Sequence, residues 1–226
     1  MNLMGQIVKE FTMDAIIHIG TEKTGSTSLQ HFLAENRPQL AAQGILYPIT
    51  PGATCHTRLM TYCLNNNRQD DSHVYMGLLD PERRRQWQQK FAEELNQELT
   101  QASANGISTV IFSSELFHSR LTHPEEITAL KALLSPYFDS IRVLIYLRRQ
   151  DELAVSLYST RLKYCENDAG YFNEQDPHSA FFNYSILLHL WAEVFGHSNI
   201  NARVFSKTKL LQGDLIYDAC QQLGIN

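Results

Sequence analysis

The sequence predicts an α/β protein of three layers, in which a central, mainly parallel sheet is flanked by helices on both faces. Short apolar runs alternate with longer helix-like stretches along the 226 residues. The apolar runs are continuous, as is typical of strands that are buried on both faces of a parallel sheet. With 43% hydrophobic and 19% charged residues, the chain can bury a sizeable core, and we expect one domain over residues 1–226.

The expected strands are apolar runs bounded by turn or polar residues, and they lie at 15–20, 108–113, 141–147 and 202–205. Helices are expected at 27–36, 38–43, 81–104, 124–137, 151–166, 179–195 and 210–224. Pro81 and Pro124 stand at first helical positions, and Gly44, Gly106 and Gly196 stand where helices should end. These signals support the predicted alternation of strands and helices.

Two polar stretches, 49–79 and 167–178, interrupt this rhythm and are rich in Asn, Asp, Gly and aromatic residues. Long irregular segments in compact domains are commonly lids or binding loops, so we expect acceptor or lid loops there. The chain stops directly after the last expected helix, which leaves open whether a further segment follows Asn226.

Composition excludes several classes of protein. A formal charge of −5 argues against a general nucleic-acid binder or a polybasic membrane protein, so any anion site must be local. The four cysteines lack the spacing of a zinc site or a disulfide framework. No secretory signal is visible and no run approaches the ~20 apolar residues of a membrane span, so we expect a soluble, cytoplasmic protein.

The most informative stretch is Gly20-Thr21-Glu22-Lys23-Thr24-Gly25-Ser26-Thr27, which follows an expected strand and precedes an expected helix. The first N–H groups of a helix have no partner within it, and its dipole is positive at that end. Small residues before the helix let an oxyanion approach the backbone. The loop therefore predicts a phosphate or sulfate ligand.

This loop departs from the nucleotide loop G-x-x-x-x-G-K-[ST], because Ser26 stands at the lysine position and the lysine lies inside the loop as Lys23. In kinases and NTPases, the lysine and a metal-holding strand-end aspartate act on the terminal phosphates. The other strand ends here carry Glu115 and Arg148, and neither matches that aspartate. A metal-free group transfer fits better.

Transfer of a sulfuryl group from a phosphosulfate donor fits these residues. The moving group carries less charge than a phosphoryl group, so cationic side chains and amides can handle it. The Lys23 ammonium group, placed at the bridging oxygen, would stabilise the negative charge that develops on the leaving phosphate. The amides from Thr24 to Thr27, with the hydroxyls of Ser26 and Thr27, would hold the 5′-phosphate.

A second element runs from the expected strand at 141–147 through Arg148 and Arg149 into a helix that contains Ser156. Arg148 and Ser156 are eight residues apart, so a strand end and the second turn of the next helix can converge there. One guanidinium and one hydroxyl would then bind a second phosphate.

With both elements present, the chain resembles the sulfotransferases that use 3′-phosphoadenosine 5′-phosphosulfate (PAPS), particularly their carbohydrate-directed and bacterial branches. The run from Glu22 to Leu29, which includes Ser28, resembles the family's 5′-phosphosulfate loop, and Arg148 with Ser156 resembles its 3′-phosphate site. Glu22 replaces the usual Pro or Arg, and Arg149-Gln150 replaces a polar residue plus Pro. The resemblance implies a P-loop NTPase-like fold, PAPS as donor, no metal, and a hydroxyl or amine acceptor.

Three residues compete as the base that activates the acceptor. Glu115 follows a strand of the parallel sheet and should face the cleft that contains Lys23, although it could instead cap a helix or pair with a cation. His56, in the irregular 49–79 stretch, could also reach the acceptor, as histidines do in branches of the family. His18 lies on a strand and is more typical of a hydrogen-bonded core residue.

The leading hypothesis is therefore sulfuryl transfer from PAPS to a hydroxyl on a saccharide or polysaccharide. The alternatives are a Mg-ATP-dependent P-loop kinase or NTPase, and a domain that binds a nucleotide or glycan without turnover. Neither the acceptor nor the oligomeric state can be read from the sequence.

Overall fold

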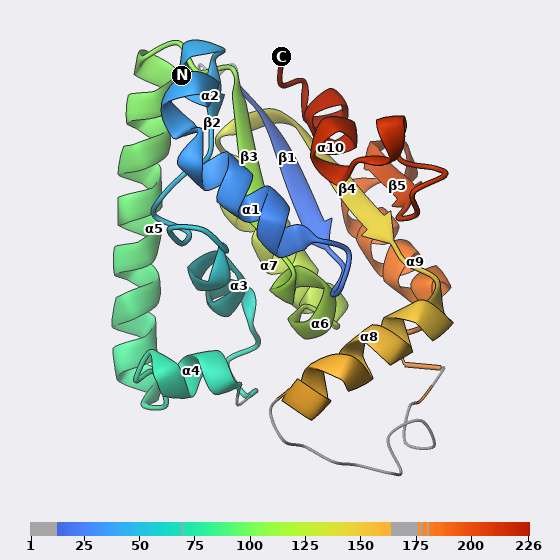
Figure 1. Ribbon diagram of the computed structural model, residues 1–226. Coiled ribbons are helices and arrows are strands. Elements are labelled where there is room, and N and C mark those ends of the chain that lie inside the picture. Colours follow the sequence, from blue (N-terminus) through green and yellow to red (C-terminus); the bar gives the residue numbers. More distant parts are fainter. Residues whose placement is uncertain (1–12, 69, 164–175, 177, 180) are drawn as a thin grey trace, which may run out of the picture.

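The computed structural model describes residues 13–68, 70–163, 176, 178–179 and 181–226. Its centre is a five-stranded sheet in which every strand pair is parallel, in the order β2-β3-β1-β4-β5. The strands are β1 (Met13–Gly20), β2 (Ile45–Leu46), β3 (Thr109–Ser114), β4 (Phe138–Leu147) and β5 (Ile200–Val204). The predicted three-layer α/β class with a parallel sheet is confirmed (Figure 1).

Helices cover both faces of the sheet. On one face lie α1 (Ser26–Glu35), α2 (Arg37–Ala42) and α10 (Leu215–Leu223). On the other face lie α3 (Thr57–Cys63), α5 (Pro81–Ala104), α6 (Leu116–Arg120), α7 (Pro124–Leu134) and α9 (Tyr184–Phe195). Two more helices, α4 (Asp71–Tyr75) and α8 (Gln150–Lys163), flank these layers (Figure 1).

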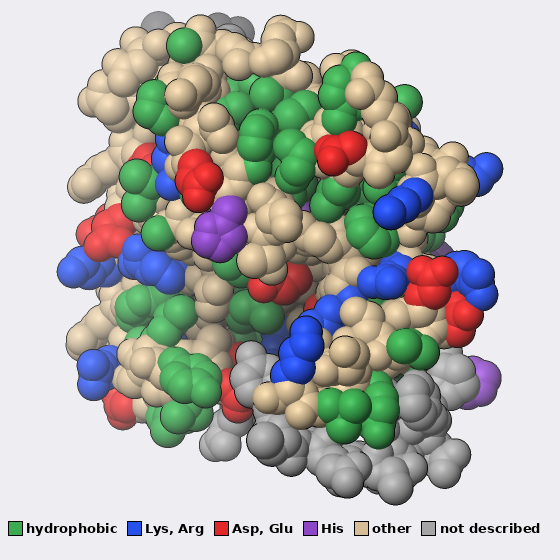
Figure 2. All heavy atoms as spheres, viewed as in Figure 1, with side chains coloured by type: hydrophobic (Ala, Val, Ile, Leu, Met, Phe, Trp, Pro, Cys, Tyr) green, Lys and Arg blue, Asp and Glu red, His purple; other side chains and the backbone are tan. Residues whose placement is uncertain are grey.

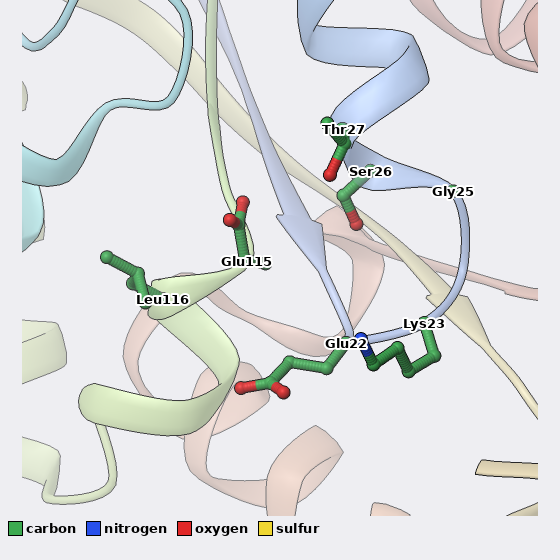
Figure 3. A pocket seen from close by; sticks show the side chains of 7 residues that line it. All are labelled: Glu22, Lys23, Gly25, Ser26, Thr27, Glu115 and Leu116. Carbon is green, nitrogen blue, oxygen red and sulfur yellow. The ribbon is translucent and has the colours of Figure 1, made fainter. Parts of the chain in front are cut away.

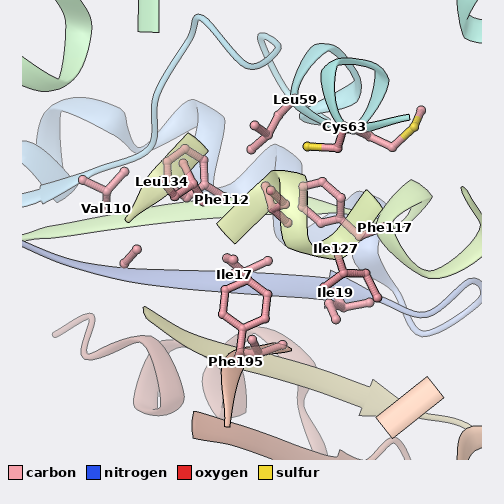
Figure 4. Close-up of a cluster of buried hydrophobic side chains, with 14 of the residues drawn as sticks. Ile17, Ile19, Leu59, Cys63, Val110, Phe112, Phe117, Ile127, Leu134 and Phe195 are labelled. Carbon is pink, nitrogen blue, oxygen red and sulfur yellow. The ribbon is translucent and has the colours of Figure 1, made fainter. Parts of the chain in front are cut away.

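The alternation of side chains along β1 divides the core into two clusters. Ile17 and Ile19 point into the larger cluster, where they meet Phe112 of β3 and Phe195 of α9 (Figure 4). Ile16 points to the opposite face, into the cluster that includes side chains of α1 and α10. Because β1 is buried on both faces, its run of apolar residues is continuous, as the sequence predicts for a central parallel strand.

The stretch 49–79 differs from the prediction, because it contains the helices α3 and α4. Leu59 and Met60 of α3 are fully buried in the larger cluster. A helix of one or two turns carries too few repeats to show a 3.6-residue pattern, and its stability comes from packing. The second stretch, 167–178, lies outside the described residues except for Asp176 and His178.

The parallel arrangement brings three strand ends to one edge of the sheet. The loop before α1 leaves β1, Glu115 follows β3, and Arg148 follows β4, and these are three neighbouring strands. Ligands of open α/β sheets bind beyond this carboxyl edge. None of the helices among the described residues is long and apolar enough to cross a membrane.

Candidate active site

The loop between β1 and α1 leaves the first amides of α1 available to a ligand. Gly25 is the residue that caps α1, and it has no side chain to accept hydrogen bonds from these amides. The first backbone bond of the helix runs from the N–H of Leu29 to the carbonyl of Gly25 at 3.2 Å. The N–H groups of residues 26–28 precede that bond, so they can bind an anion, as the sequence predicts for this loop.

Gly25 is required by the backbone. Its φ of 78° lies in the left-handed region, which side chains disfavour. A Cβ placed on Gly25 would also lie 2.6 Å from a methyl carbon of Leu215 in α10. The glycine therefore allows α10 to pack against the start of α1.

Lys23 adopts a left-handed backbone conformation with φ of 63°, one of two such non-glycine residues in the described chain. A conformation of this kind costs about 1–3 kcal/mol and persists only where surrounding contacts impose it. Those contacts are present. Thr24 Oγ1 donates to the carbonyl of Thr21 at 2.6 Å, Thr21 Oγ1 donates to the carbonyl of Tyr146, and Arg148 Nη1 donates to the carbonyl of Lys23 at 2.9 Å.

A cavity of about 440 Å³ lies between this loop and the end of β3 (Figure 3). Its walls include three loop residues, the first two residues of α1 and two residues at the start of α6, namely Glu22, Lys23, Gly25, Ser26, Thr27, Glu115 and Leu116. Of the predicted donor-binding side chains, Lys23, Ser26 and Thr27 therefore line it. Thr24 is buried and its hydroxyl is engaged within the loop, whereas Ser28 is exposed on α1.

Arg148 and Ser156 line a second cavity, of about 380 Å³, over the first turns of α8. The eight-residue spacing therefore brings the two side chains to one site, as predicted. Arg148 Nε also pairs with Glu152 at 3.3 Å. Through the bond to the carbonyl of Lys23, the same guanidinium connects this cavity to the loop.

A third cavity, of about 410 Å³, shares Arg148 and Glu152 with the second and is also lined by Phe205 and Lys207. The guanidinium carbon of Arg148 lies 5.8 Å from the centre of the Phe205 ring. The sequence pattern predicts no role for Phe205 or Lys207. The available signal is that Phe205 directly follows β5 and Lys207 comes soon after it, at the same edge of the sheet as Glu115 and Arg148.

Cationic side chains gather in one part of the surface, near the candidate site. Figure 2 shows Lys and Arg side chains gathered beside a hollow in the surface, in the region of α8 and the loop before α1, with acidic side chains close to them. This arrangement agrees with a chain whose net charge is −5 and whose anion site must be local.

Glu115 lines the first cavity, as the sequence predicts for a strand-end carboxylate. Its carboxylate accepts a hydrogen bond from Gln30 Nε2 at 2.7 Å and another from Cys55 Sγ at 3.4 Å. In Figure 3 the side chain of Glu115 points toward the start of α1. Two donors from different elements thus hold this carboxylate in place.

His56 is placed in the core and is not part of this cavity. It is fully buried, stacks on the ring of Tyr47 with 4.5 Å between centroids, and accepts the N–H of Ser113 on Nδ1 at 3.1 Å. Burial lowers the pKa of His56 to about 3, so its imidazole is neutral. The structure gives His56 a packing role where the sequence suggested a base.

His18 is also a core residue, in agreement with the expectation that was favoured for it. Its Nδ1 lies 2.8 Å from Ser113 Oγ, and burial lowers its pKa to about 4. Neither histidine faces the cavity that contains Lys23. The carboxylates of that cavity are therefore the better candidates for a base.

Glu22 is the residue of the site that sequence analysis missed. The sequence pattern predicts no chemical role for it. In the structure it lines the cavity beside Lys23, and its side chain extends toward α6 (Figure 3). An acidic residue next to the loop lysine was the available signal.

No protein-family model and no curated protein matches this sequence. Among solved structures, a sulfotransferase from Alicyclobacillus acidocaldarius matches at 14% identity with a TM-score of 0.49, over 93% of this chain and 81% of that one. The sulfotransferase domain of the Synechococcus PCC 7002 olefin synthase matches at 12% identity with a TM-score of 0.48, over 96% of this chain and 74% of that one. At these values the similarity provides no residue-by-residue correspondence, so we derive the function from the residues of this chain.

Proposed function

We propose that this protein is a sulfotransferase that moves the sulfuryl group of PAPS to a hydroxyl of a saccharide or polysaccharide. The observation that carries the proposal is the position of Lys23. It lies inside the anion-binding loop, in a left-handed conformation that contacts from Thr21, Thr24 and Arg148 support. A constrained cation in this loop is suited to a group that becomes charged during the reaction.

The loop supplies the site for the donor's 5′-phosphosulfate. The amides at the start of α1 and the hydroxyls of Ser26 and Thr27 bind its oxygens. The acceptor oxygen attacks sulfur, and the bond between sulfur and the bridging oxygen breaks. Lys23 stabilises the negative charge that the leaving 3′,5′-bisphosphate gains, and this interaction is strongest in the transition state.

The donor's 3′-phosphate is bound by Arg148 and Ser156, which line one cavity. The Arg148 guanidinium is suited to bidentate binding of phosphate, and the Ser156 hydroxyl adds a single donor. Lys207, which lines the third cavity together with Arg148, adds a further positively charged group to this region.

The acceptor enters beside Glu115 and Leu116, at the wall of the first cavity that the end of β3 and the start of α6 form. Support comes from the stretch 49–79, whose Cys55 contacts both Ser114 and Glu115, at 3.2 Å and 3.4 Å. This stretch therefore contributes to acceptor selection. A carboxylate of the cavity, Glu115 or Glu22, takes the proton of the acceptor hydroxyl.

Calorimetric titration with adenosine 3′,5′-bisphosphate and with ADP tests the donor class. We expect tighter binding of the bisphosphate, because only that ligand presents a phosphate to Arg148 and Ser156. Equal, weak binding of both ligands would contradict the proposal. Tighter binding of ADP that requires added Mg²⁺ would instead indicate a kinase or NTPase.

Transfer itself is tested with sulfur-labelled PAPS and a panel of neutral saccharides, with and without EDTA. We expect labelled product that chelator does not suppress. If the bisphosphate binds and no acceptor is labelled, the domain binds the nucleotide without turnover. That result would overturn the proposed activity while retaining the donor site.

A further inference from the structure

The cavity that contains Lys23 has two carboxylates with different surroundings. Glu22 comes from the β1–α1 loop, and Glu115 comes from the end of β3. In Figure 3 their side chains point in different directions, that of Glu115 toward the start of α1 and that of Glu22 toward α6. The two groups are therefore suited to different tasks.

Glu115 is held by hydrogen bonds. Gln30 Nε2 donates to Oε2 at 2.7 Å, and Gln30 is itself buried at 2% exposure. Cys55 Sγ donates to the same oxygen at 3.4 Å. Because both bonds end on one oxygen, they fix the direction in which the Glu115 carboxylate faces.

Glu22 lies next to Lys23 in the chain and lines the same cavity, so it stands beside the group that acts on the donor. Burial raises the pKa of Glu22 above its usual value, and the Glu115 carboxylate acts in the same direction. The Ser119 hydroxyl, the Lys23 ammonium and the Arg120 guanidinium oppose this shift in part. A carboxylate with a raised pKa accepts a proton more readily near neutral pH.

We propose that Glu22 is the general base of this enzyme and that Glu115 forms a fixed part of the wall of the first cavity, beside the acceptor. This inference rests on the sulfuryl transfer proposed above. The acceptor O–H bond breaks and its proton passes to the Glu22 carboxylate, while the acceptor oxygen forms a bond to sulfur. The bond between sulfur and the bridging oxygen breaks, and its electron pair leaves with the 3′,5′-bisphosphate beside Lys23.

The test compares two phenols of similar shape that differ in acidity. At a pH where 4-nitrophenol is ionised and 4-methoxyphenol is protonated, only the second acceptor needs a base. We expect Glu22→Gln to lower kcat for 4-methoxyphenol about a hundredfold or more and to change kcat for 4-nitrophenol by less than about threefold.

Two further variants serve as comparisons. Glu115→Gln should change both rates by the same factor, because it alters the cavity wall without removing the base. Glu125→Gln, an exposed position at the start of α7, should change neither. Equal loss on both phenols in Glu22→Gln, no loss on either, or a selective loss in Glu115→Gln would overturn the assignment.

Titration of the carboxyl groups gives a second readout that needs no acceptor. Carbon NMR of protein labelled at glutamate carboxyls, with Glu22→Gln to assign the signal, should show Glu22 titrating above the ordinary range of a glutamate carboxyl. If neither phenol reacts in the wild type, this titration decides the assignment, and a Glu22 signal within or below that range would overturn it. Failure to bind adenosine 3′,5′-bisphosphate would instead contradict the proposed function itself.

Discussion

Arg148 Nη1 donates a hydrogen bond to the carbonyl oxygen of Lys23 at 2.9 Å, although the two residues are 125 positions apart. This bond joins the two loops that the sequence predicts to bind the two ends of one donor. It also helps hold Lys23 at a φ of 63°, a conformation that costs an L-residue about 1–3 kcal/mol. In the proposed enzyme one guanidinium therefore has two tasks, binding a phosphate and supporting the loop that carries the lysine.

Arg148→Ala should weaken binding of adenosine 3′,5′-bisphosphate by about 10- to 100-fold, because a hydrogen bond to a charged group contributes about 1.5–3 kcal/mol. Binding of ADP, which lacks the 3′-phosphate, should weaken by less. Calorimetry with both ligands measures this difference.

Arg149→Ala is the matched control for this change. Arg149 is 71% exposed and pairs with Asp151 at 2.6 Å, and surface pairs of this kind contribute about 0–1 kcal/mol. We expect bisphosphate affinity within about twofold of the wild type. A loss in Arg149→Ala equal to that in Arg148→Ala would mean that general positive charge, and not the Arg148 site, binds the ligand.

Substitution of Lys23 should separate catalysis from stability. Lys23→Ala should reduce turnover by at least about a hundredfold and leave bisphosphate binding within about tenfold, as expected for an interaction made mainly in the transition state. Lys23→Gly should lose turnover equally.

The two variants of Lys23 should differ in stability, because glycine accepts a positive φ and alanine does not. We expect Lys23→Gly to be more stable than Lys23→Ala by about 1 kcal/mol in urea unfolding. Unchanged turnover in either variant would remove Lys23 from the mechanism. Equal stability would mean that the left-handed backbone carries no strain.

The sequence predicts much of the fold because buried parallel strands and long helices leave clear patterns. The helix Pro81–Ala104 is predicted with its bounds, since a proline begins it and apolar residues repeat along it. The two-residue strand Ile45–Leu46 and the short helices within 49–79 are not predicted. Packing against distant elements determines them, and local sequence does not record that packing.

The site is predicted in part for the same reason. Lys23, Ser26 and Arg148 follow from the loop pattern and the strand–helix spacing, because those are local features. His56 is buried in a stack with the ring of Tyr47, and Arg148 bonds to the Lys23 carbonyl. Both arrangements depend on contacts between separate segments of the chain. The carboxylate of Glu22 acquires its surroundings only when α6 lies beside the loop.

Buried histidines should make the protein lose stability in mild acid. Burial lowers the pKa of His18 and His118 to about 4 and that of His56 to about 3. Between these values and the ordinary pKa of about 6.5, the unfolded chain binds protons that the folded chain excludes. Their contribution to the free energy of unfolding is thus complete above pH ~6.5 and declines as the pH falls toward ~4.

Urea unfolding at neutral pH and near pH 5 measures this dependence. Each buried histidine can contribute a slope of up to about 1.4 kcal/mol per pH unit in that window. A variant such as His56→Phe should be less stable at neutral pH and show a shallower slope. A stability that stays constant over this range would contradict the assignment of these imidazoles as buried and neutral.

The two carboxylates of the first cavity, which contains Lys23, should make the proposed enzyme prefer uncharged acceptors. Glu22 and Glu115 both line the cavity, and a negatively charged acceptor would approach them against like charge. At an effective dielectric constant of about 20, such repulsion over several Å is on the order of 1–3 kcal/mol. We expect a neutral saccharide to have a kcat/KM at least about tenfold higher than its uronate or sulfated counterpart at low salt. Because salt screens this repulsion, the preference should decrease as ionic strength rises. A sulfated acceptor that reacts faster than its neutral counterpart would show that cationic groups outside this cavity select the acceptor.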